Sequence, residues 1–159
     1  MRVSEPGRFG LLDGRQPEPR VSYVVARLER ALRGEINERV KPWGLTTLQY
    51  TTLSILEHGE QLSNAQLARR AYMTPQSMSE VLEALERKQL VERTPHPTHR
   101  RVFPAALTAK GRMVLEACNK AVDELEREML AGMTPHQVRS LRKGLVSAVR
   151  ALHAGLPSR

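Results

Sequence analysis

The central stretch of the chain, residues 62–101, reads LSNAQLARRAYMTPQSMSEVLEALERKQLVERTPHPTHRR. Its pattern predicts two helices joined by a tight turn and followed by a β-hairpin, the layout of a winged helix-turn-helix. The first helix should open at Ser63, because Gln66 three positions later completes a capping box. The second should open at Thr74, with Pro75 in its first turn, where a missing N–H costs nothing. We therefore expect the fold to be organised around this second helix.

The second helix is strongly amphipathic. Apolar residues recur at i, i+3, i+4 and i+7 and predict one buried stripe, formed by Met78, Val81, Leu82 and Leu85. The opposite face has no apolar side chain and consists of Gln76, Glu80, Glu83 and Arg87, with Ser77 and Ser79 at its flanks. A helix held on one side, with short hydrogen-bonding groups near its N-terminus on the other, suits insertion into a DNA major groove. An ordinary surface helix is the alternative interpretation.

The hairpin that follows has a cationic tip. Residues 90–94 and 101–107 are expected to be strands, and residues 95–100 a turn. The tip combines two arginines and two histidines with no acid: His96, His99, Arg100 and Arg101. Arginines on a projecting hairpin can reach a phosphate backbone or a minor groove. A solvated loop that is basic by chance is the alternative.

From about residue 21 to residue 152, these motifs together resemble the MarR family of bacterial transcription regulators. At the wing, His99-Arg100-Arg101 is followed after five residues by Leu107-Thr108, which is similar to the family's Asp-x-Arg and Leu-Thr. Upstream, residues 45–50 are similar to its Leu-Thr-x-x-Gln-Tyr/Phe opening, and residues 85–93 to its passage from helix to wing. The resemblance implies a dimeric, DNA-binding transcription regulator with a winged helix-turn-helix.

The chain departs from the family pattern at three positions. His99 replaces the wing aspartate, which in the family looks as if it braces the following arginine, so the pattern does not fix the orientation of Arg101. Gln89 replaces a glycine usual at the end of the second helix, so the turn needs another cap. Pro104 lies inside the expected returning strand, where it cannot donate to a ladder, and predicts a bulge or an unpaired position.

Length and composition favour one mainly helical domain, or one protomer of an oligomer. The chain has 159 residues, 40% of them hydrophobic and 4% aromatic, which suits a helical core better than a sheet sandwich. It has no apolar run of 18 residues and no apolar N-terminal h-region, so we expect a soluble, cytoplasmic protein without a membrane partner. A single cysteine, Cys118, excludes an internal disulfide framework.

The charge favours a polyanionic partner but is unevenly distributed. The net charge is +8 and the pI about 10.4, as in many nucleic-acid-binding proteins. Residues 46–108, however, carry seven basic and six acidic side chains, so the segment expected to bind DNA is nearly neutral. An alternative function therefore stays open, a winged-helix protein-interaction module without DNA binding.

The chain divides into four expected segments. Residues 1–19 should form a flexible N-terminal arm, residues 20–45 a dimerisation helix, residues 46–108 the winged helix-turn-helix DNA-binding lobe, and residues 109–159 the C-terminal dimerisation helices. The terminal helices carry apolar stripes that so small a centre cannot bury, so we expect a homodimer whose two second helices meet a palindrome. A monomer whose terminal helices close on their own core is the alternative.

Apolar periodicity also predicts which side chains the other helices bury. The first helix should bury Val21, Val24, Leu28, Leu32, Ile36 and Val40, and end at Pro42 and Gly44. The next opens with a capping box of Thr46 and Gln49 and should bury Leu48, Thr52, Leu53, Ile55 and Leu56. The helix from Thr108 carries Val114, Leu115, Cys118, Val122, Leu125 and Met129 in register, and the last, from Thr134, has an apolar face of Val138, Leu141, Leu145, Ala148 and Leu152.

Nine residues are candidates for DNA contact: Thr74, Gln76, Ser77, Ser79, Glu80, Arg87, His99, Arg100 and Arg101. Gln76, Ser77, Ser79 and Glu80 are expected to face base edges, since glutamine can pair with adenine and glutamate can accept from cytosine. Thr74 and Arg87 are expected nearer phosphates. The partner is thus double-stranded DNA, read in the major groove by the second helix and in the minor groove or at the backbone by the wing.

The family resemblance also implies a small aromatic or acidic effector, bound between the dimerisation helices and the DNA-binding lobe, that releases the DNA. Four residues near such a cleft are candidate ligands: Tyr23, Arg27, Trp43 and Tyr50. Core packing or surface filling is the alternative for each. The expected function is therefore a dimeric repressor of palindromic operators, modulated by a small molecule.

No motif in the sequence indicates an enzyme, a cofactor or a metal. A dinucleotide or phosphate loop and a zinc-protease motif are absent, so we expect a protein that is not an enzyme. His96 and His99 are close together but have no third ligand nearby, so pH-sensitive DNA contact is a better hypothesis for them than a metal site. Cys118, on an apolar stripe, is interpreted as a packed small hydrophobe, with a sensing thiol as the alternative.

Overall fold

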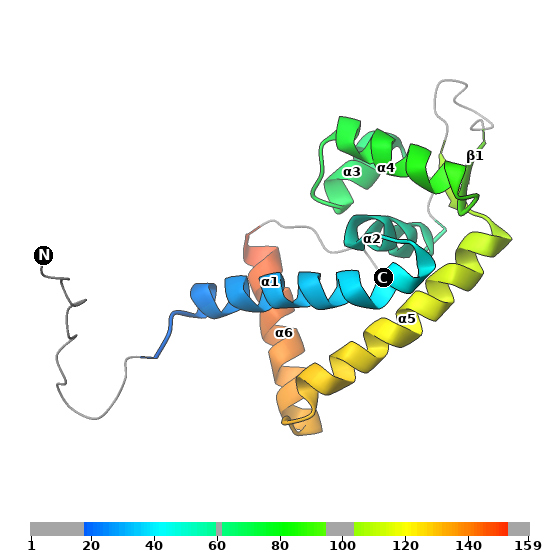
Figure 1. Ribbon diagram of the computed structural model, residues 1–159. Coiled ribbons are helices and arrows are strands. Elements are labelled where there is room, and N and C mark those ends of the chain that lie inside the picture. Colours follow the sequence, from blue (N-terminus) through cyan, green and yellow to red (C-terminus); the bar gives the residue numbers. More distant parts are fainter. Residues whose placement is uncertain (1–17, 60–61, 95–103, 153–159) are drawn as a thin grey trace, which may run out of the picture.

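The computed structural model describes residues 18–59, 62–94 and 104–152, and it is mainly helical with one β-hairpin. The elements are α1 (Val21–Val40), the 3₁₀ turn η1 (Lys41–Trp43), α2 (Thr47–Leu56), α3 (Asn64–Arg70), α4 (Pro75–Arg87), β1 (Val91–Arg93), β2 (Ala105–Leu107), α5 (Ala109–Leu130) and α6 (Pro135–Ala151). Helices α2, α3 and α4 gather with the hairpin into one lobe, and α1, α5 and α6 extend away from it (Figure 1). This is the expected winged helix-turn-helix with flanking helices.

The core of the lobe lies between α2, α3, α4 and the first half of α5. On α4, Met78, Leu82 and Leu85 are buried and Val81 is half-buried, which confirms the predicted stripe. Their largest fully buried neighbours are Leu53, Leu67 and Leu115. The prediction for α2 was wrong at Leu48, which is 43% exposed because it lies on the side of the helix that faces α1 across a cavity.

Cys118 is fully buried in this core, on α5. Burial raises the pKa of its thiol to about 11, since a thiolate there would be poorly solvated. The thiol is therefore protonated at neutral pH and packs as a small hydrophobe.

The helices begin where the sequence places their caps. Thr46 with Gln49, Ser63 with Gln66, and Thr134 with Gln137 each form a complete capping box. The side chains of Thr74 and Thr108 accept the backbone N–H three residues on, at the starts of α4 and α5. Each such cap stabilises its helix by about 1 kcal/mol, so short polar side chains determine the residue at which each of these helices begins.

Two helices end in a left-handed residue that is not glycine. Gln89 after α4 has φ 60°, and Tyr72 after α3 has φ 54°. In both cases the two final N–H groups bond back in the pattern of a Schellman motif, with Gln89 N to Glu86 O at 2.8 Å and Leu90 N to Leu85 O at 3.0 Å after α4. The end of α4 is therefore capped by the same left-handed turn that a glycine usually forms, and here Gln89 adopts it.

The hairpin pairs β1 with β2 in antiparallel register, with Val91 opposite Leu107 and Arg93 opposite Ala105. Pro104 lies just before the paired residues, and its carbonyl accepts a 3.4 Å hydrogen bond from Thr94 N. At Pro104 the register therefore continues without a bulge, and only the carbonyl of this residue is bonded, because proline has no N–H to donate. The remainder of the expected returning strand, residues 101–103, and the turn lie outside the described residues.

The outer helices bury little of their apolar surface within one chain. Of the stripe predicted for α1, only Val40 is buried, and Val21 is 79% exposed. Along α6, which the structure describes from end to end, no side chain is buried, and Leu145 and Leu152 are exposed. Helix α5 runs from the lobe to the far side of the molecule, where the chain turns into α6 (Figure 1). The apolar faces of α1 and α6 therefore lack cover in a single chain.

None of the helices in the described ranges has both the length and the apolar character needed to cross a bilayer. The expected N-terminal arm lies outside these ranges apart from residues 18 and 19.

We predict that Gly111→Ala destabilises the protein by about 2 to 3 kcal/mol. A Cβ at Gly111 would lie 2.0 Å from the backbone oxygen of Leu90, so α5 and the start of β1 would have to separate. Urea unfolding followed by circular dichroism measures the change. Gly34→Ala on α1 is the control, because nothing lies within 4 Å of its Cβ and it should be neutral or stabilising. Equal effects of the two changes would contradict the close contact.

We predict that Gln89→Gly stabilises the protein by about 0.5 to 1 kcal/mol. Glycine takes the left-handed conformation without the steric cost that Gln89 bears, and this gain exceeds the extra entropy of the unfolded chain. Thermal and urea unfolding test the change, with Gln89→Ala as a control that should leave stability nearly unchanged. A glycine variant less stable than the alanine variant would disprove this account of the turn.

Candidate nucleic-acid interface

Helix α4 presents an open polar face on the side away from the core. Gln76, Glu80, Glu83 and Arg87 are all exposed, and the buried stripe on the other side fixes the direction in which they point. The helical period predicted these four residues on one face, and their exposure confirms it. The face spans the full length of the helix and carries two acids and one base, so electrostatic attraction alone does not make it a nucleic-acid interface.

The first turn of α4 is held by its own short side chains. Thr74 Oγ1 accepts a 3.1 Å hydrogen bond from Ser77 N and donates to Ser77 Oγ at 3.0 Å. Ser79 Oγ donates to Pro75 O at 3.1 Å and accepts from Asn64 Nδ2 at 3.1 Å. Ser79 thus has its hydrogen committed inside the lobe and could only accept from a base, whereas Ser77 keeps a hydrogen to donate.

The first strand of the wing is fastened to the end of α4 by an ion pair. Arg93 Nε donates to Glu86 Oε1 at 2.9 Å, and its second nitrogen donates to Glu86 Oε2 at 2.7 Å. This two-pronged pair raises the pKa of Arg93, chiefly through the hydrogen bond to Glu86. It fixes the direction in which the wing leaves the lobe. The other predicted wing residues, His96, His99, Arg100 and Arg101, lie outside the described residues.

Three parts of the chain meet at the C-terminal end of α4. Lys88 Nζ donates to Gln49 Oε1 at 2.8 Å and to Gly44 O, both at the corner between η1 and α2. The Lys88 carbonyl accepts from Lys110 Nζ at 2.9 Å, and the Gln89 carbonyl accepts from Thr108 Oγ1 at 2.7 Å. The two carbonyls that follow α4 therefore accept from the start of α5, and the side chain of its C-cap residue is bonded to the corner beside α1.

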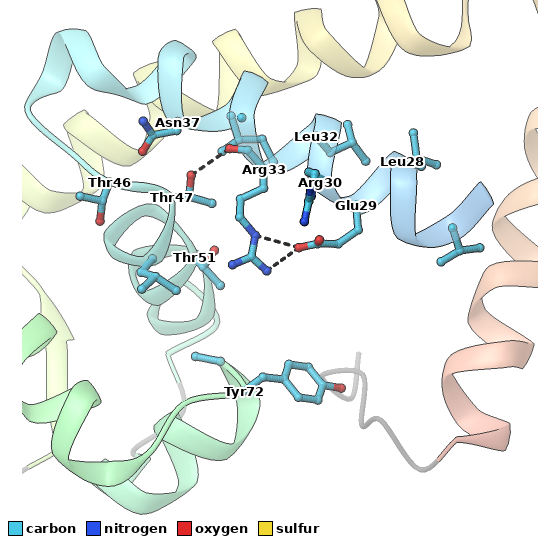
Figure 2. Close-up of a pocket in the computed structure, with 15 residues that line it drawn as sticks. Leu28, Glu29, Arg30, Leu32, Arg33, Asn37, Thr46, Thr47, Thr51 and Tyr72 are labelled. Atoms are coloured by element: carbon cyan, nitrogen blue, oxygen red, sulfur yellow. Dashed lines mark hydrogen bonds and ion pairs between the residues drawn. The ribbon is translucent and has the colours of Figure 1, made fainter. Parts of the chain in front are cut away.

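A cavity of about 990 Å³ separates α1 from the lobe. Figure 2 shows Glu29 and Arg33 of α1 on one side and Tyr72, from the turn between α3 and α4, on the other. Arg33 Nε lies 2.8 Å from Glu29 Oε1, so the guanidinium is held in place at the wall. The apolar part of the lining comes mainly from Val25, Leu28, Leu32, Ile36 and Leu48.

The four residues predicted to bind an effector do not line this cavity. Tyr23 and Arg27 lie instead on a second hollow of about 510 Å³ along α1, where the Arg27 guanidinium is 5.8 Å from the centre of the Tyr23 ring. Tyr50 is half-buried, and its hydroxyl donates to Asn119 Oδ1 of α5 at 3.0 Å. Burial raises the pKa of Tyr50, so this hydroxyl stays protonated and joins α2 to α5. Trp43 lies on η1 and is 37% exposed.

Sequence reasoning missed the residues that act across elements. The positions of Glu29 and Arg33, four apart on one helix, could have suggested their ion pair. Lys88, Lys110 and Tyr72 gave no such signal, because their partners or neighbours lie far away in the sequence.

The chain is similar to known proteins of one family. The MarR family profile matches residues 43–102. The HTH-type transcriptional repressor Rv2887 of Mycobacterium tuberculosis is 39% identical over 92 residues, which are 58% of this chain and 66% of that protein, just under two thirds of the relative's length. The BldR regulator of Sulfolobus solfataricus is 29% identical, with a TM-score of 0.75 over 82% of this chain and 93% of that one.

A likeness in fold alone extends to a structure of S. aureus MepR in complex with DNA. That match is 22% identical, with a TM-score of 0.74 over 84% of this chain and 99% of that one. The profile, the relatives in sequence and the shared fold agree with one another and with the motifs around α4, and all of them indicate the MarR family.

Proposed function

We propose that this protein is a sequence-specific, double-stranded-DNA-binding transcription regulator that acts as a dimeric repressor of palindromic operators. The observation that carries the proposal is the exposed polar face of α4, which the buried stripe on its other side holds outward. A helix about 10 to 12 Å across fits the roughly 12 Å width of a B-DNA major groove. The function is one of binding, and no chemical step is assigned to the chain.

Relatives support this proposal by what their names state. Rv2887 is named a transcriptional repressor, and the MepR structure is a complex with DNA. The sequence of the present chain matches the family profile from the corner before α2 to the wing, the part that contains α4. These names support the proposal that the same geometry binds double-stranded DNA here.

The residues of α4 divide by their remaining hydrogen-bonding capacity. Gln76 is exposed in the first turn and can pair bidentately with adenine, and Glu80 one turn later can accept from a cytosine amino group. Ser77 can donate to a base or a phosphate. Arg87 is exposed at the far end, where it can bind a phosphate. From the wing, we assign His99, Arg100 and Arg101 to the minor groove or backbone on the sequence alone.

Dimerisation covers the apolar faces of the outer helices. Val21, Val24 and Val25 of α1 and Leu145 of α6 are exposed in one chain. Both helices are nevertheless regular: α6 begins with a capping box, and α1 continues directly into η1. A second copy related by a two-fold axis would bury these faces against its own and would place two α4 helices on the two halves of a palindrome.

A small effector would bind in the cavity between α1 and the lobe, with an acidic or aromatic group near Arg33 and an apolar part against Leu32 and Leu48. It would release DNA only by preferring the DNA-incompetent arrangement of the dimer, and a tenfold preference supplies about 1.4 kcal/mol. The four residues assigned from sequence, Tyr23, Arg27, Trp43 and Tyr50, remain a separate proposal for this role.

We predict that Gln76→Ala changes the preferred operator at one base pair and weakens binding to the original sequence by about 1 to 3 kcal/mol. Arg87→Ala should instead weaken binding to all duplexes and lower the salt dependence by about one unit. Selection of bound duplexes from a random pool, followed by titration at several salt concentrations, measures both effects. Equal losses on every sequence from the two changes would refute this division of roles.

The same titration separates the proposal from its alternative, a winged-helix protein-interaction module. A DNA-binding protein with several phosphate contacts loses affinity steeply as salt rises. An adaptor would bind no duplex even in dilute buffer.

We predict that the protein sediments at twice its chain mass of 17.9 kDa at micromolar concentration, because the faces of α1 and α6 cover one another. Leu145→Asp, which places a charge in this face, should shift the species to the monomer mass and weaken binding to a palindromic duplex by at least about tenfold. Ser147→Asp adds the same charge two residues along α6 at an exposed polar position and serves as the control. A monomeric wild-type protein would exclude the assembly.

A further inference from the structure

Lys88, at the C-terminal cap of α4, contacts both the α1 side and the α5 side of the molecule. Its ammonium donates to Gly44 O and Gln49 Oε1, and its carbonyl accepts from Lys110 Nζ. Gly44 ends η1, which continues α1, and Lys110 lies in the first turn of α5. A single residue at the end of α4 therefore connects the lobe to the two long helices, α1 and α5.

The bonds of Lys88 are suited to holding an angle rather than to binding a partner. The side chain is half-buried, and two of its three ammonium hydrogens are taken by fixed acceptors. Gln49 is itself held, because its side chain closes the capping box of α2 by accepting from Thr46 N. Gly44 is fixed by its left-handed turn. Lys88 thus joins two rigid points, in contrast to Arg87 beside it, which is exposed.

A small change of angle at this point becomes a large displacement at the other end of α4. Gln76 is twelve residues before Lys88, a distance of about 18 Å along a helix at 1.5 Å per residue. A tilt of about 10° of the lobe about its Lys88 end would therefore move Gln76 by about 3 Å, close to the 3.4 Å rise of one DNA base pair. In the proposed dimer, the lobe angle would thus decide which half-site spacing the two α4 helices can meet.

We propose that Lys88 is a positioning residue that sets the angle of the lobe against α1 and α5, and through it the half-site spacing that the dimer accepts. The inference rests on the proposed DNA-binding function and deepens it. Lys88 itself contacts no DNA in this arrangement, since its ammonium is bonded inside the protein. Its role is to give the two α4 helices one fixed separation instead of a range.

The test measures the affinity of full-length protein for its selected palindrome and for the same duplex with one base pair added to or removed from the spacer. Wild type should bind the altered spacers at least about tenfold more weakly, as expected for rigidly held α4 helices. Lys88→Met keeps the aliphatic stem but loses the donors. It should reduce this discrimination to about threefold or less while leaving the salt dependence of binding unchanged.

Two controls identify the cause of any change. Lys120→Met removes the same charge from an exposed ion pair with Glu116 on α5 and should keep the wild-type spacing preference. Gln49→Glu keeps both the capping position and the acceptor for Lys88, so this variant should keep the wild-type spacing preference. The double variant with Lys88→Met should lose that preference. Circular dichroism and melting temperature show whether Lys88→Met is folded; if it is not, Lys88→Gln, which is polar but ends one bond short of the lysine nitrogen, should reduce the discrimination too.

Three results would overturn the inference. A folded Lys88→Met or Lys88→Gln with the wild-type spacing preference would show that the bonds do not set the angle. A salt dependence lower by about one unit would make Lys88 a phosphate contact. Wild-type protein that binds no duplex would overturn the proposed function and this inference with it, whereas the first two results leave the proposed function intact.

Discussion

The structure depends on burying α4 from one side only. Met78, Leu82 and Leu85 are removed from water by α2 and α3, and burying side chains of this size contributes about 1.5 to 3 kcal/mol each. Because these three side chains occupy one stripe, the opposite face has to point outward whatever its sequence. Gln76, Glu80 and their exposed neighbours can therefore be substituted with little effect on the stability of the fold. Specificity and stability are separated on the two sides of one helix.

The charges of the lobe bear on how a nearly neutral segment could bind the proposed polyanionic partner. Glu86 is neutralised by Arg93, and in doing so it fixes the wing rather than repelling phosphate. Glu80 and Glu83 remain exposed on the face of α4, where a carboxylate is tolerated near DNA only if it accepts from a base or stays clear of phosphates. In the proposed complex, attraction would therefore come from Arg87, at the last position of α4, and from the basic residues between β1 and β2, whereas Gln76 and Glu80 would contribute discrimination more than affinity.

Local sequence patterns predicted the helices and strands and where they begin and end. They did not predict contacts between residues that are far apart in the sequence. Thr46, Ser63 and Thr134 cap the helices that begin after them because capping is decided within four residues. Leu48 failed as a core residue because periodicity defines a face but does not show whether another element covers it. The same holds for the candidate site. The open face of α4 could be predicted from the apolar stripe on its other side. The bonds of Lys88 could not, because they link positions 39 and 44 residues apart.

The outer helices extend the same reasoning beyond one chain. Helix α6 has a complete capping box and a regular apolar face, yet buries no side chain. An isolated helix of 17 residues is marginal in water, so such a face persists only if something covers it. The lobe cannot supply that cover, because its own core already closes around Leu53 and Leu115. A chain built this way suits the proposed dimer, in which the contacts that complete the fold would also fix the distance between the long helices that carry the two copies of α4.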